Sequence, residues 1–208
     1  MTNFWETKFR NEGLLWNFEP SDSAGMALEL FKTNQIQKIL IPGVGYGRNA
    51  KLFVDQGFDV AGIEISKSAI ELARQNGLHF PVHCGSVTEM PFDQELFDGI
   101  FCYALIHLLN KPDRRKFLQH CFNQLKPGRI MVFTMASTEM SMYGQGKRLS
   151  KDRFSIQNGL TVFFYNQDSV VREFLAFGLT ECQDIAEPVK FKEGENPIHM
   201  YYVVCKKQ

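Results

Sequence analysis

Lys38-Ile39-Leu40-Ile41-Pro42-Gly43-Val44-Gly45-Tyr46-Gly47-Arg48 is the stretch that decides the fold. Its first half, 38–41, is a short apolar run of the kind that a parallel sheet buries on both faces. Three alternating glycines follow, and glycine allows a positive φ and the close approach of a ligand to the backbone. Residues 47–56 have a helical pattern, so free N–H groups face the loop. The stretch predicts a strand, a ligand-binding turn and a helix.

An acidic residue stands where a second strand is expected to end. Val60-Ala61-Gly62-Ile63-Glu64 is apolar up to its last residue, and Glu64 follows Gly43 at the spacing of about 20 residues that a ribose-binding acid has. Because neighbouring parallel strands end at the same edge of a sheet, Glu64 is expected beside the glycine loop, where its carboxylate can accept ribose hydroxyls. The two signals together predict a nucleoside-binding site.

The glycine spacing separates two kinds of nucleoside site. Dinucleotide-binding enzymes usually have a glycine at the position that Arg48 takes in this chain. The spacing here is Gly-x-Gly-x-Gly, which weighs against NAD. A nicotinamide-dependent reductase with the same kind of loop is the less favoured alternative.

Five motifs, in order along the chain, resemble those of the class I S-adenosylmethionine-dependent methyltransferases. They are Ile41-Pro42-Gly43-Val44-Gly45-Tyr46-Gly47, Gly62-Ile63-Glu64-Ile65-Ser66, Cys84-Gly85-Ser86-Val87-Thr88-Glu89-Met90-Pro91-Phe92, Phe97-Asp98-Gly99-Ile100-Phe101 and Leu125-Lys126-Pro127-Gly128. The resemblance covers residues 36–136. It implies a three-layer α/β, Rossmann-like fold with a doubly wound, mostly parallel seven-stranded sheet of order 3-2-1-4-5-7-6, the last strand antiparallel. It also implies S-adenosylmethionine as cofactor and S-adenosylhomocysteine as product.

The front end of the chain resembles a narrower group. Residues 4–16 look like the opening of the thiopurine, thiol and halide methyltransferases and, more loosely, of the tellurite-resistance methyltransferases. Ile41 favours the thiopurine and halide branch, which has Val or Ile before the proline where many members have an acid. The resemblance implies that residues 1–35 hold N-terminal helices and a lid, with Trp5 and Trp16 closing over the cofactor. Anchoring of the N-terminal helix is the alternative role for both tryptophans.

The resemblance also assigns cofactor contacts residue by residue. The set comprises Gly43, Gly45, Gly47, Glu64, Ile65, Ser86, Val87, Tyr103, Ala104, Trp5 and Trp16. Ser86 and Val87 match a motif in which many relatives carry an acid that accepts from the adenine amino group. Because serine is weaker there, the Val87 N–H is expected to carry more of the recognition, through an adenine ring nitrogen. Tyr103 and Ala104 follow the fourth strand, where the amino-acid end of the cofactor is expected.

Methyl transfer from a sulfonium needs little acid or base catalysis. The leaving group is already activated by its positive charge, so holding donor and acceptor in line can supply most of the effect. Catalytic residues are therefore hard to read from the sequence. The candidates are Tyr143, Tyr165, Tyr46 and His107, and packing is the alternative role for each. No His/Cys cluster has the spacing of metal ligands, so no metal is expected.

The acceptor is expected to bind the segment with the least regular pattern, residues 137–165. This insertion is rich in methionine, aromatic and basic residues: Met140, Met142, Tyr143, Lys147, Arg148, Lys151, Arg153, Phe154, Phe163, Phe164 and Tyr165. Methionine and aromatic side chains suit an adaptable apolar roof. The basic residues suit either an anionic acceptor or a solvated face. Its size favours a small-molecule acceptor, namely a thiol, oxyanion, amine or chalcogen. A non-catalytic cofactor sensor, with this segment serving a protein partner, is the alternative.

Composition limits the class of protein. The 208 residues suit one domain, and 23 basic and 23 acidic residues leave no positive field for nucleic acid. No apolar run approaches the roughly 18 residues of a membrane span, and the N-terminus lacks the apolar core of a signal peptide. Five cysteines without paired spacing favour a reducing cytoplasm. We expect a cytoplasmic monomer or homodimer.

Periodicity predicts the remaining elements. Helices are expected at 21–34, from Ser66 or Ser68, from 112 to 125 and at 166–177; strands at 81–84, 97–103, 130–133, 179–185 and 199–205; and a turn at 126–128. Met26, Val171 and Leu175 are expected on the buried faces of their helices.

Overall fold

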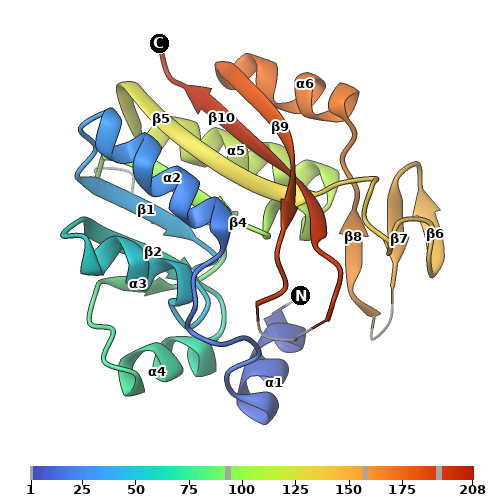
Figure 1. The fold of residues 1–208 in the computed structure, drawn as a ribbon, viewed down its shortest axis with the longest axis horizontal. Coiled ribbons are helices and arrows are strands. Elements are labelled where there is room, and N and C mark those ends of the chain that lie inside the picture. The colour runs from blue at the N-terminus through green and yellow to red at the C-terminus, as the bar shows by residue number, and fades with distance from the viewer. Residues whose placement is uncertain (1, 92–94, 157–158, 191–193) are drawn as a thin grey trace.

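The computed structural model describes residues 2–91, 95–156, 159–190 and 194–208 (Figure 1). The helices are α1 Thr2–Glu12, α2 Asp22–Thr33, α3 Arg48–Asp55, α4 Lys67–Gln75, α5 Lys111–Gln124 and α6 Gln167–Phe174, with 3-10 turns η1 Ile106–Leu108 and η3 Leu175–Phe177. The strands are β1 Lys38–Pro42, β2 Asp59–Glu64, β3 Val82–Cys84, β4 Phe97–Tyr103, β5 Leu125–Ala136, β6 Lys147–Ser150, β7 Arg153–Ser155, β8 Thr161–Phe163, β9 Leu179–Glu187 and β10 Ile198–Lys206.

Seven strands form one sheet in the order β3-β2-β1-β4-β5-β10-β9. β1 pairs in parallel with β2 and β4, and β4 pairs in parallel with β5. β10 is antiparallel to both of its neighbours, β5 and β9. The predicted sheet order, with the last strand inserted antiparallel between the fifth and sixth, is confirmed. The carboxyl ends of β1, β2 and β4 therefore lie along one edge of the sheet.

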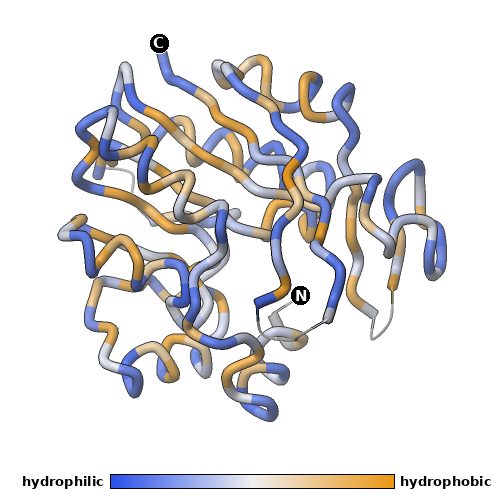
Figure 2. The backbone as a smooth tube through the Cα atoms, in the orientation of Figure 1, coloured by the Kyte–Doolittle hydropathy of each residue, from blue (hydrophilic) through white to orange (hydrophobic). Residues whose placement is uncertain are grey.

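Helices cover both faces of this sheet (Figure 1), and Figure 2 shows that hydrophobic residues are frequent along its central strands. Successive side chains of a strand point to opposite faces. Ile39 and Ile41 of β1 belong to the apolar cluster that includes Phe31 of α2 and Phe53 of α3. Leu40 belongs to a second cluster with residues of α5 and α6. All of these side chains are buried. The continuous apolar run at 38–41 thus serves two cores at once, as the sequence predicted.

Side-chain caps fix where the helices begin. Ser21 accepts a hydrogen bond from the Ala24 N–H at the start of α2, and Asn110 accepts one from Asp113 N–H at the start of α5. Ser66, and not Ser68, caps α4 by accepting from Ala69 N–H. Ser68 is used differently, as described below.

Several predicted details are wrong. Lys126, Pro127 and Gly128 lie within β5, which begins at Leu125 with an irregular pairing to β4, and a turn was predicted there. Met26, Val171 and Leu175 are exposed. The helix at 167 ends at Phe174 and continues as the 3-10 turn η3, which rotates Leu175 out of the apolar stripe.

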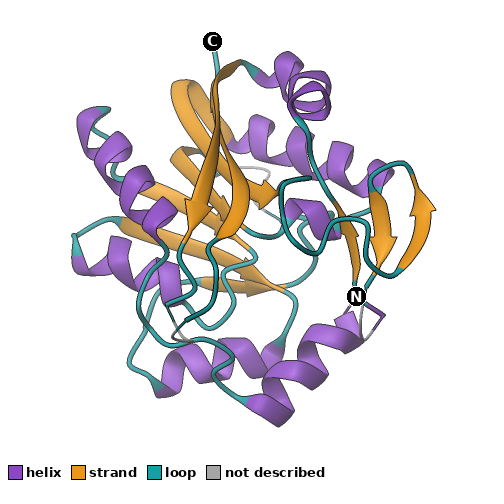
Figure 3. Cartoon of the chain, turned by 45° about the vertical axis from the view of Figure 1, so that its right-hand side comes forward, coloured by secondary structure: helices purple, strands orange, loops and turns teal. Residues whose placement is uncertain are grey.

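The segment 137–165 is more regular than its sequence indicates. β6, β7 and β8 form a three-stranded antiparallel sheet beside the main sheet (Figure 3). Backbone hydrogen bonds close its base, from Thr138 N–H to Tyr165 O at 2.8 Å and from Tyr165 N–H to Ala136 O at 2.8 Å. We call this unit the side sheet. Among the described residues, no helix combines the length and apolarity that crossing a bilayer requires.

Candidate functional site

The glycine loop folds back onto the end of β2. The N–H groups of Gly43 and Val44 both donate to Ile63 O, at 2.8 and 3.2 Å. Gly47 has a φ of +85°, and a Cβ built there would lie 2.5 Å from Leu78 Cδ1. A side chain at Gly47 would therefore be strained by the backbone conformation and would also require the Leu78 side chain to shift. Gly45 also has a positive φ, of +59°, but a Cβ there would meet nothing nearer than 3.9 Å.

Glu64 ties this loop to the start of α4. Its Oε2 accepts from Gly45 N–H at 2.8 Å, and its Oε1 accepts from the N–H groups of Ile65 and Ser66, each at 2.9 Å. The side chain is buried, and burial raises the pKa of Glu64 although these three bonds oppose the shift. A carboxylate offers about four acceptor positions. The described residues leave one of these positions on Oε2 unused.

The adenine side of the predicted site lies beside Glu64. Gly85 N–H donates to Glu64 O at 2.9 Å, which brings the residues after β3 to the end of β2. The Ser86 hydroxyl is paired with that of Thr88 at 2.9 Å. Val87 has a buried side chain, and no described residue accepts a hydrogen bond from its N–H. This N–H fits the predicted role as a donor to an adenine ring nitrogen.

An arginine that the sequence analysis did not assign lies at the opposite end of the loop. Arg48 begins α3, and its guanidinium carbon lies 5.9 Å from the centre of the Trp16 ring and 5.3 Å from that of Tyr103. Burial raises the pKa of Tyr103 to about 12. Ala104 adopts a positive φ of 51°, and its N–H donates to Thr134 O at 3.1 Å. Arg48, Trp16 and Tyr103 thus meet where the amino-acid end of the cofactor was predicted.

Tyr46, inside the glycine loop, holds the N-terminal segment. Its hydroxyl donates to Trp16 O and accepts from Trp16 N–H at 3.1 Å, and the two rings stack at 6.3 Å. Phe9 of α1 packs edge-on against Tyr46 at 6.0 Å. Burial raises the pKa of Tyr46 to about 12. These contacts bring Trp16 to the glycine loop, as the lid prediction requires, and leave the Tyr46 hydroxyl with a structural partner.

Glu6 attaches α1 to α4 and is a second residue that the sequence analysis missed. Its Oε2 accepts from the Ser66 hydroxyl at 2.8 Å and from Ser68 N–H at 3.1 Å, and its Oε1 accepts from the Ser68 hydroxyl at 2.7 Å. These bonds lower the pKa of Glu6, the Ser68 hydroxyl contributing most. A carboxylate at a helix N-terminus is favoured by the helix dipole. Ser66 therefore contacts both Glu6 and Glu64.

The other candidate catalytic residues lie apart from the loop. Tyr165 is fully buried and its hydroxyl donates to Glu173 Oε2 at 2.9 Å. His107 is buried and accepts from Ala136 N–H at 3.1 Å through Nδ1, and burial lowers its pKa to about 4. Tyr143 alone among these is exposed, and its hydroxyl donates to Asp152 at 2.8 Å.

The pKa shifts of the three tyrosines agree in direction. Burial raises the pKa of Tyr46 and Tyr165, and the hydrogen bond to Asp152 raises that of Tyr143. All three hydroxyls stay protonated near neutral pH. None of them is poised as a phenolate base, so the geometry favours positioning over proton removal by tyrosine.

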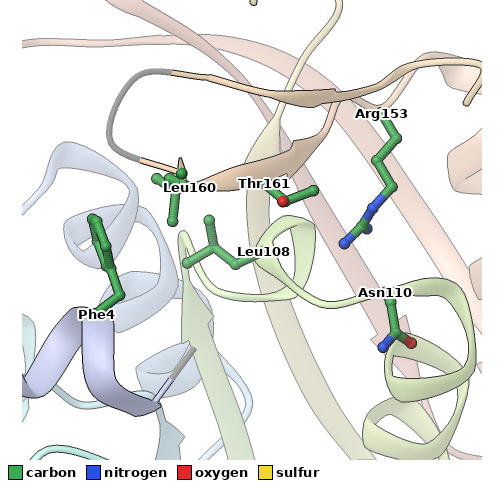
Figure 4. Close-up of a pocket in the computed structure, with 7 residues that line it drawn as sticks. Phe4, Leu108, Asn110, Arg153, Leu160 and Thr161 are labelled. Atoms are coloured by element: carbon green, nitrogen blue, oxygen red, sulfur yellow. The ribbon is translucent and has the colours of Figure 1, made fainter. Parts of the chain in front are cut away.

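A cavity of about 230 Å³ opens between α1, the turn after β4 and the side sheet (Figure 4). Phe4, Leu108, Asn110, Arg153, Gly159, Leu160 and Thr161 line it. Trp5 connects this region to the glycine loop, since it packs against the cluster of Leu108 and Phe154 and also against that of Phe9 and Tyr46. The cavity lies on the acceptor side that the sequence analysis assigned to residues 137–165.

Comparison with known proteins agrees with this geometry. A family model described as "Methyltransferase domain" matches residues 39–128. The chain is similar to 24-methylenesterol C-methyltransferase 3 of Arabidopsis thaliana, 31% identical over 51% of this chain and 31% of that protein. It is also similar to the ubiquinone biosynthesis O-methyltransferase of Alkalilimnicola ehrlichii, 28% identical over 51% of this chain and 44% of that one. The chain spans less than half the length of each of these relatives.

A solved structure shows the same fold over the whole chain. The Burkholderia thailandensis 1,6-didemethyltoxoflavin-N1-methyltransferase, determined with 1,6-didemethyltoxoflavin and S-adenosylhomocysteine, superposes with a TM-score of 0.72 at 14% identity, covering 100% of this chain and 87% of that one. The matching family model begins at residue 39, so the resemblance of residues 4–16 to the thiopurine and tellurite-resistance enzymes stays a prediction. Residues 39–128 therefore match a methyltransferase domain, and the ordered motifs and the strand order of the chain are similar to those of the class I S-adenosylmethionine-dependent methyltransferases.

Proposed function

We propose that this protein transfers the methyl group of S-adenosylmethionine to a small-molecule acceptor. The observation that carries the proposal is the 2.8 Å bond between Gly45 N–H and Glu64, which joins the glycine loop and the acid at one edge of the sheet. The free acceptor position on Glu64 and the Val87 N–H fit a ribose and an adenine ring. The relatives named for sterol, quinone and toxoflavin methylation support small acceptors as a class.

The residues present would hold the cofactor along this edge. In our proposal Gly43, Gly45 and Gly47 let its methionine and ribose portion approach the backbone, and Glu64 takes a ribose hydroxyl. Arg48 is placed to pair with the carboxylate of its amino-acid end, near Tyr103 and Ala104. Trp16 would cover the donor and exclude water, which keeps the nucleophile desolvated.

The chemistry that S-adenosylmethionine supplies when bound is a methyl group on a positively charged sulfur. When bound, it would supply this methyl group to the acceptor's lone pair, with S-adenosylhomocysteine as the leaving group and the acceptor proton released to solvent. The protein's part is to hold the acceptor in line, which effective molarities show can be worth several kcal/mol. We further propose that the Tyr143 hydroxyl orients the acceptor.

Calorimetry and turnover test this function. We expect S-adenosylmethionine and S-adenosylhomocysteine to bind in the micromolar range and NAD to give no measurable heat. A panel of thiols, oxyanions, amines and chalcogen compounds with labelled donor should then give a methylated product. Tight NAD binding would contradict the methyltransferase assignment, and cofactor binding without turnover of any acceptor would favour the sensor.

We also propose that residues 1–208 form one domain, with residues 1–35 as N-terminal helices and lid and residues 137–165 as the acceptor-side insertion. All five cysteines are free, which supports a place in the reducing cytoplasm. Sedimentation of the purified protein distinguishes the monomer from the homodimer.

A further inference from the structure

Arg153 brings a positive charge to the cavity without a carboxylate partner. It lies on β7, is partly buried, and one of its N–H groups donates to Leu109 O at 2.7 Å. None of the carboxylates in the described residues forms an ion pair with it. Its remaining guanidinium N–H groups extend toward Asn110 and Leu108 (Figure 4).

The neighbouring charges are already paired. Arg114 is buried and binds Glu173 through two bonds, from Nη2 at 2.7 Å and from Nε at 2.9 Å. Asp113 is held by Asn110 Nδ2 at 2.6 Å at the start of α5. Burial and the nearby Arg114 lower the pKa of Arg153. The Asp113 carboxylate opposes this shift, but Arg153 forms no ion pair with a described residue, and partial burial makes its charge attractive to an anion.

The cavity has one polar and one apolar end. Arg153, Asn110 and Thr161 form the polar end, and no described residue forms a hydrogen bond with the Thr161 hydroxyl. Phe4, Leu108 and Leu160 form the apolar end, where the two leucine side chains point toward each other (Figure 4). Such a site suits a molecule with an apolar body and a single charged group.

We propose that this cavity binds the methyl acceptor, and that the acceptor carries a carboxylate held by Arg153 and an apolar body held by Phe4, Leu108 and Leu160. A planar guanidinium matches the two oxygens of a carboxylate. One guanidinium without an ion-pair partner among the described residues matches the single negative charge of a carboxylate, whereas a phosphate carries about two. At about 230 Å³ the cavity is below the usual range for drug-sized ligands, which indicates a small molecule.

The position of the cavity agrees with this role. Leu108 lies in the turn that follows β4, whose carboxyl end reaches the proposed cofactor edge. Phe4 comes from α1, and its neighbour Trp5, 5.1 Å away between ring centres, also packs near the glycine loop. The inference rests on the proposed function, since the carboxylate site becomes an acceptor site only if the donor binds beside it.

Benzoate and its uncharged isostere benzamide test the carboxylate, with phenyl phosphate as the dianion. Each is titrated into the protein saturated with S-adenosylhomocysteine, and binding is followed by the backbone amide signals of Asn110 and Thr161 in NMR spectra. We expect benzoate to shift these signals and to bind at least tenfold more tightly than benzamide or phenyl phosphate. Loss of a charge-assisted bond accounts for a factor of this size.

Variants of two arginines on the side sheet distinguish binding at this cavity from non-specific electrostatic attraction. Arg153→Gln should weaken benzoate binding at least tenfold and Arg153→Lys less. Arg148→Gln should leave it unchanged, because Arg148 is exposed on β6. S-Adenosylhomocysteine affinity and the CD melting temperature check that each variant is folded.

The possible results have separate meanings. Equal binding of benzoate and benzamide, tighter binding of phenyl phosphate, or equal effects of Arg153→Gln and Arg148→Gln would overturn the carboxylate site. A protein that binds benzoate through Arg153 but does not bind S-adenosylhomocysteine would contradict the proposed function and leave the carboxylate site standing.

Discussion

Glu64 connects three backbone N–H groups from two segments through one carboxylate. Sequence spacing predicts its place at the end of β2, but the number of its partners appears only in the folded chain. This changes what a substitution of Glu64 does. The residue is part of the loop's own structure as well as a proposed ligand for ribose.

Glu64→Gln and Glu64→Ala should therefore differ. Alanine leaves three N–H groups without their acceptor, and each buried one costs about 1–3 kcal/mol. The Glu64→Ala variant should therefore have a much lower free energy of unfolding. Glutamine keeps an oxygen for Ile65 and Ser66 and turns its NH₂ toward Gly45, so it loses chiefly the loop bond. We expect Glu64→Gln to weaken S-adenosylhomocysteine binding at least tenfold with a smaller loss of stability. Calorimetry and urea denaturation followed by CD measure both, and unchanged affinity would place Glu64 outside the ligand site.

His107 gives stability a dependence on pH. Burial lowers its pKa to about 4 from 6.5, so the unfolded chain takes up a proton at a pH where the folded chain does not. This difference therefore does not affect the free energy of unfolding above pH 6.5, and it lowers that free energy as the pH falls from 6.5 toward 4. Between pH 7 and pH 5 this amounts to about 2 kcal/mol.

The variant His107→Asn isolates this effect, because its Oδ1 can still accept from Ala136 N–H without titrating. The loss of unfolding free energy between pH 7 and pH 5 should be about 2 kcal/mol smaller in the variant than in the parent. Urea denaturation at both pH values measures it. Since the other histidines are common to both proteins, an identical pH dependence would show that His107 is protonated alike in the folded and unfolded chains.

At the scale of elements, α1 is held in place mainly by contacts at its first two turns. Glu6 binds the start of α4, while Phe9 packs on Tyr46. Because Ser66 contacts both Glu6 and Glu64, the attachment of α1 lies next to the proposed ribose position. The sequence indicates that residues 1–35 could cover the site, but it does not show which side chain fastens them.

Glu6→Ala should release α1. Without the carboxylate, the Ser68 N–H at the start of α4 loses its partner and α1 loses three bonds. We expect faster proteolysis and faster hydrogen exchange within residues 2–12, and less protection on addition of S-adenosylhomocysteine. Glu12→Ala is the control, since Glu12 is exposed and pairs with Lys8 on the same helix. Equal cleavage of both variants would mean that aromatic packing alone holds α1.

At the scale of the whole molecule, the side sheet packs against a buried ion pair of the main domain. Arg114 of α5 binds Glu173 of α6, and its guanidinium carbon lies 4.0 Å from the centre of the Phe163 ring of β8. Tyr165 adds its hydroxyl to Glu173. α5 thus shares one charged contact with α6 and β8, which lie close to each other but distant from α5 in the sequence.

Removing one partner of this pair should be costly. Glu173→Gln leaves Arg114 buried without its countercharge, and breaking a buried pair in this way typically costs about 3–5 kcal/mol. Asp55→Asn is the matched control, because the Lys51–Asp55 pair is exposed and should contribute less than about 1 kcal/mol. Urea denaturation followed by CD compares them. Similar losses in both variants would mean that the Arg114 charge reaches solvent.

The parts of this fold that could be predicted are those set by local pattern. Alternating strands and helices, the presence of a capping residue within 21–23 and at Ser66 or Ser68, and the motif order all follow from neighbouring residues. The side sheet could not be predicted, because its short strands have mixed polarity and depend on packing against Leu108 and Ala136. Arg48 and Glu6 were missed for a similar reason: their partners lie far away in the sequence.

Both tryptophans of the protein, Trp5 and Trp16, belong to the N-terminal segment that packs on the glycine loop. Indole emission therefore reports on this segment and not on the seven-stranded sheet. A fluorescence melt would follow the undocking of α1, and far-UV CD would follow loss of the sheet and helices. If the two curves separate, the protein does not unfold in two states, and a single melting temperature would describe neither process.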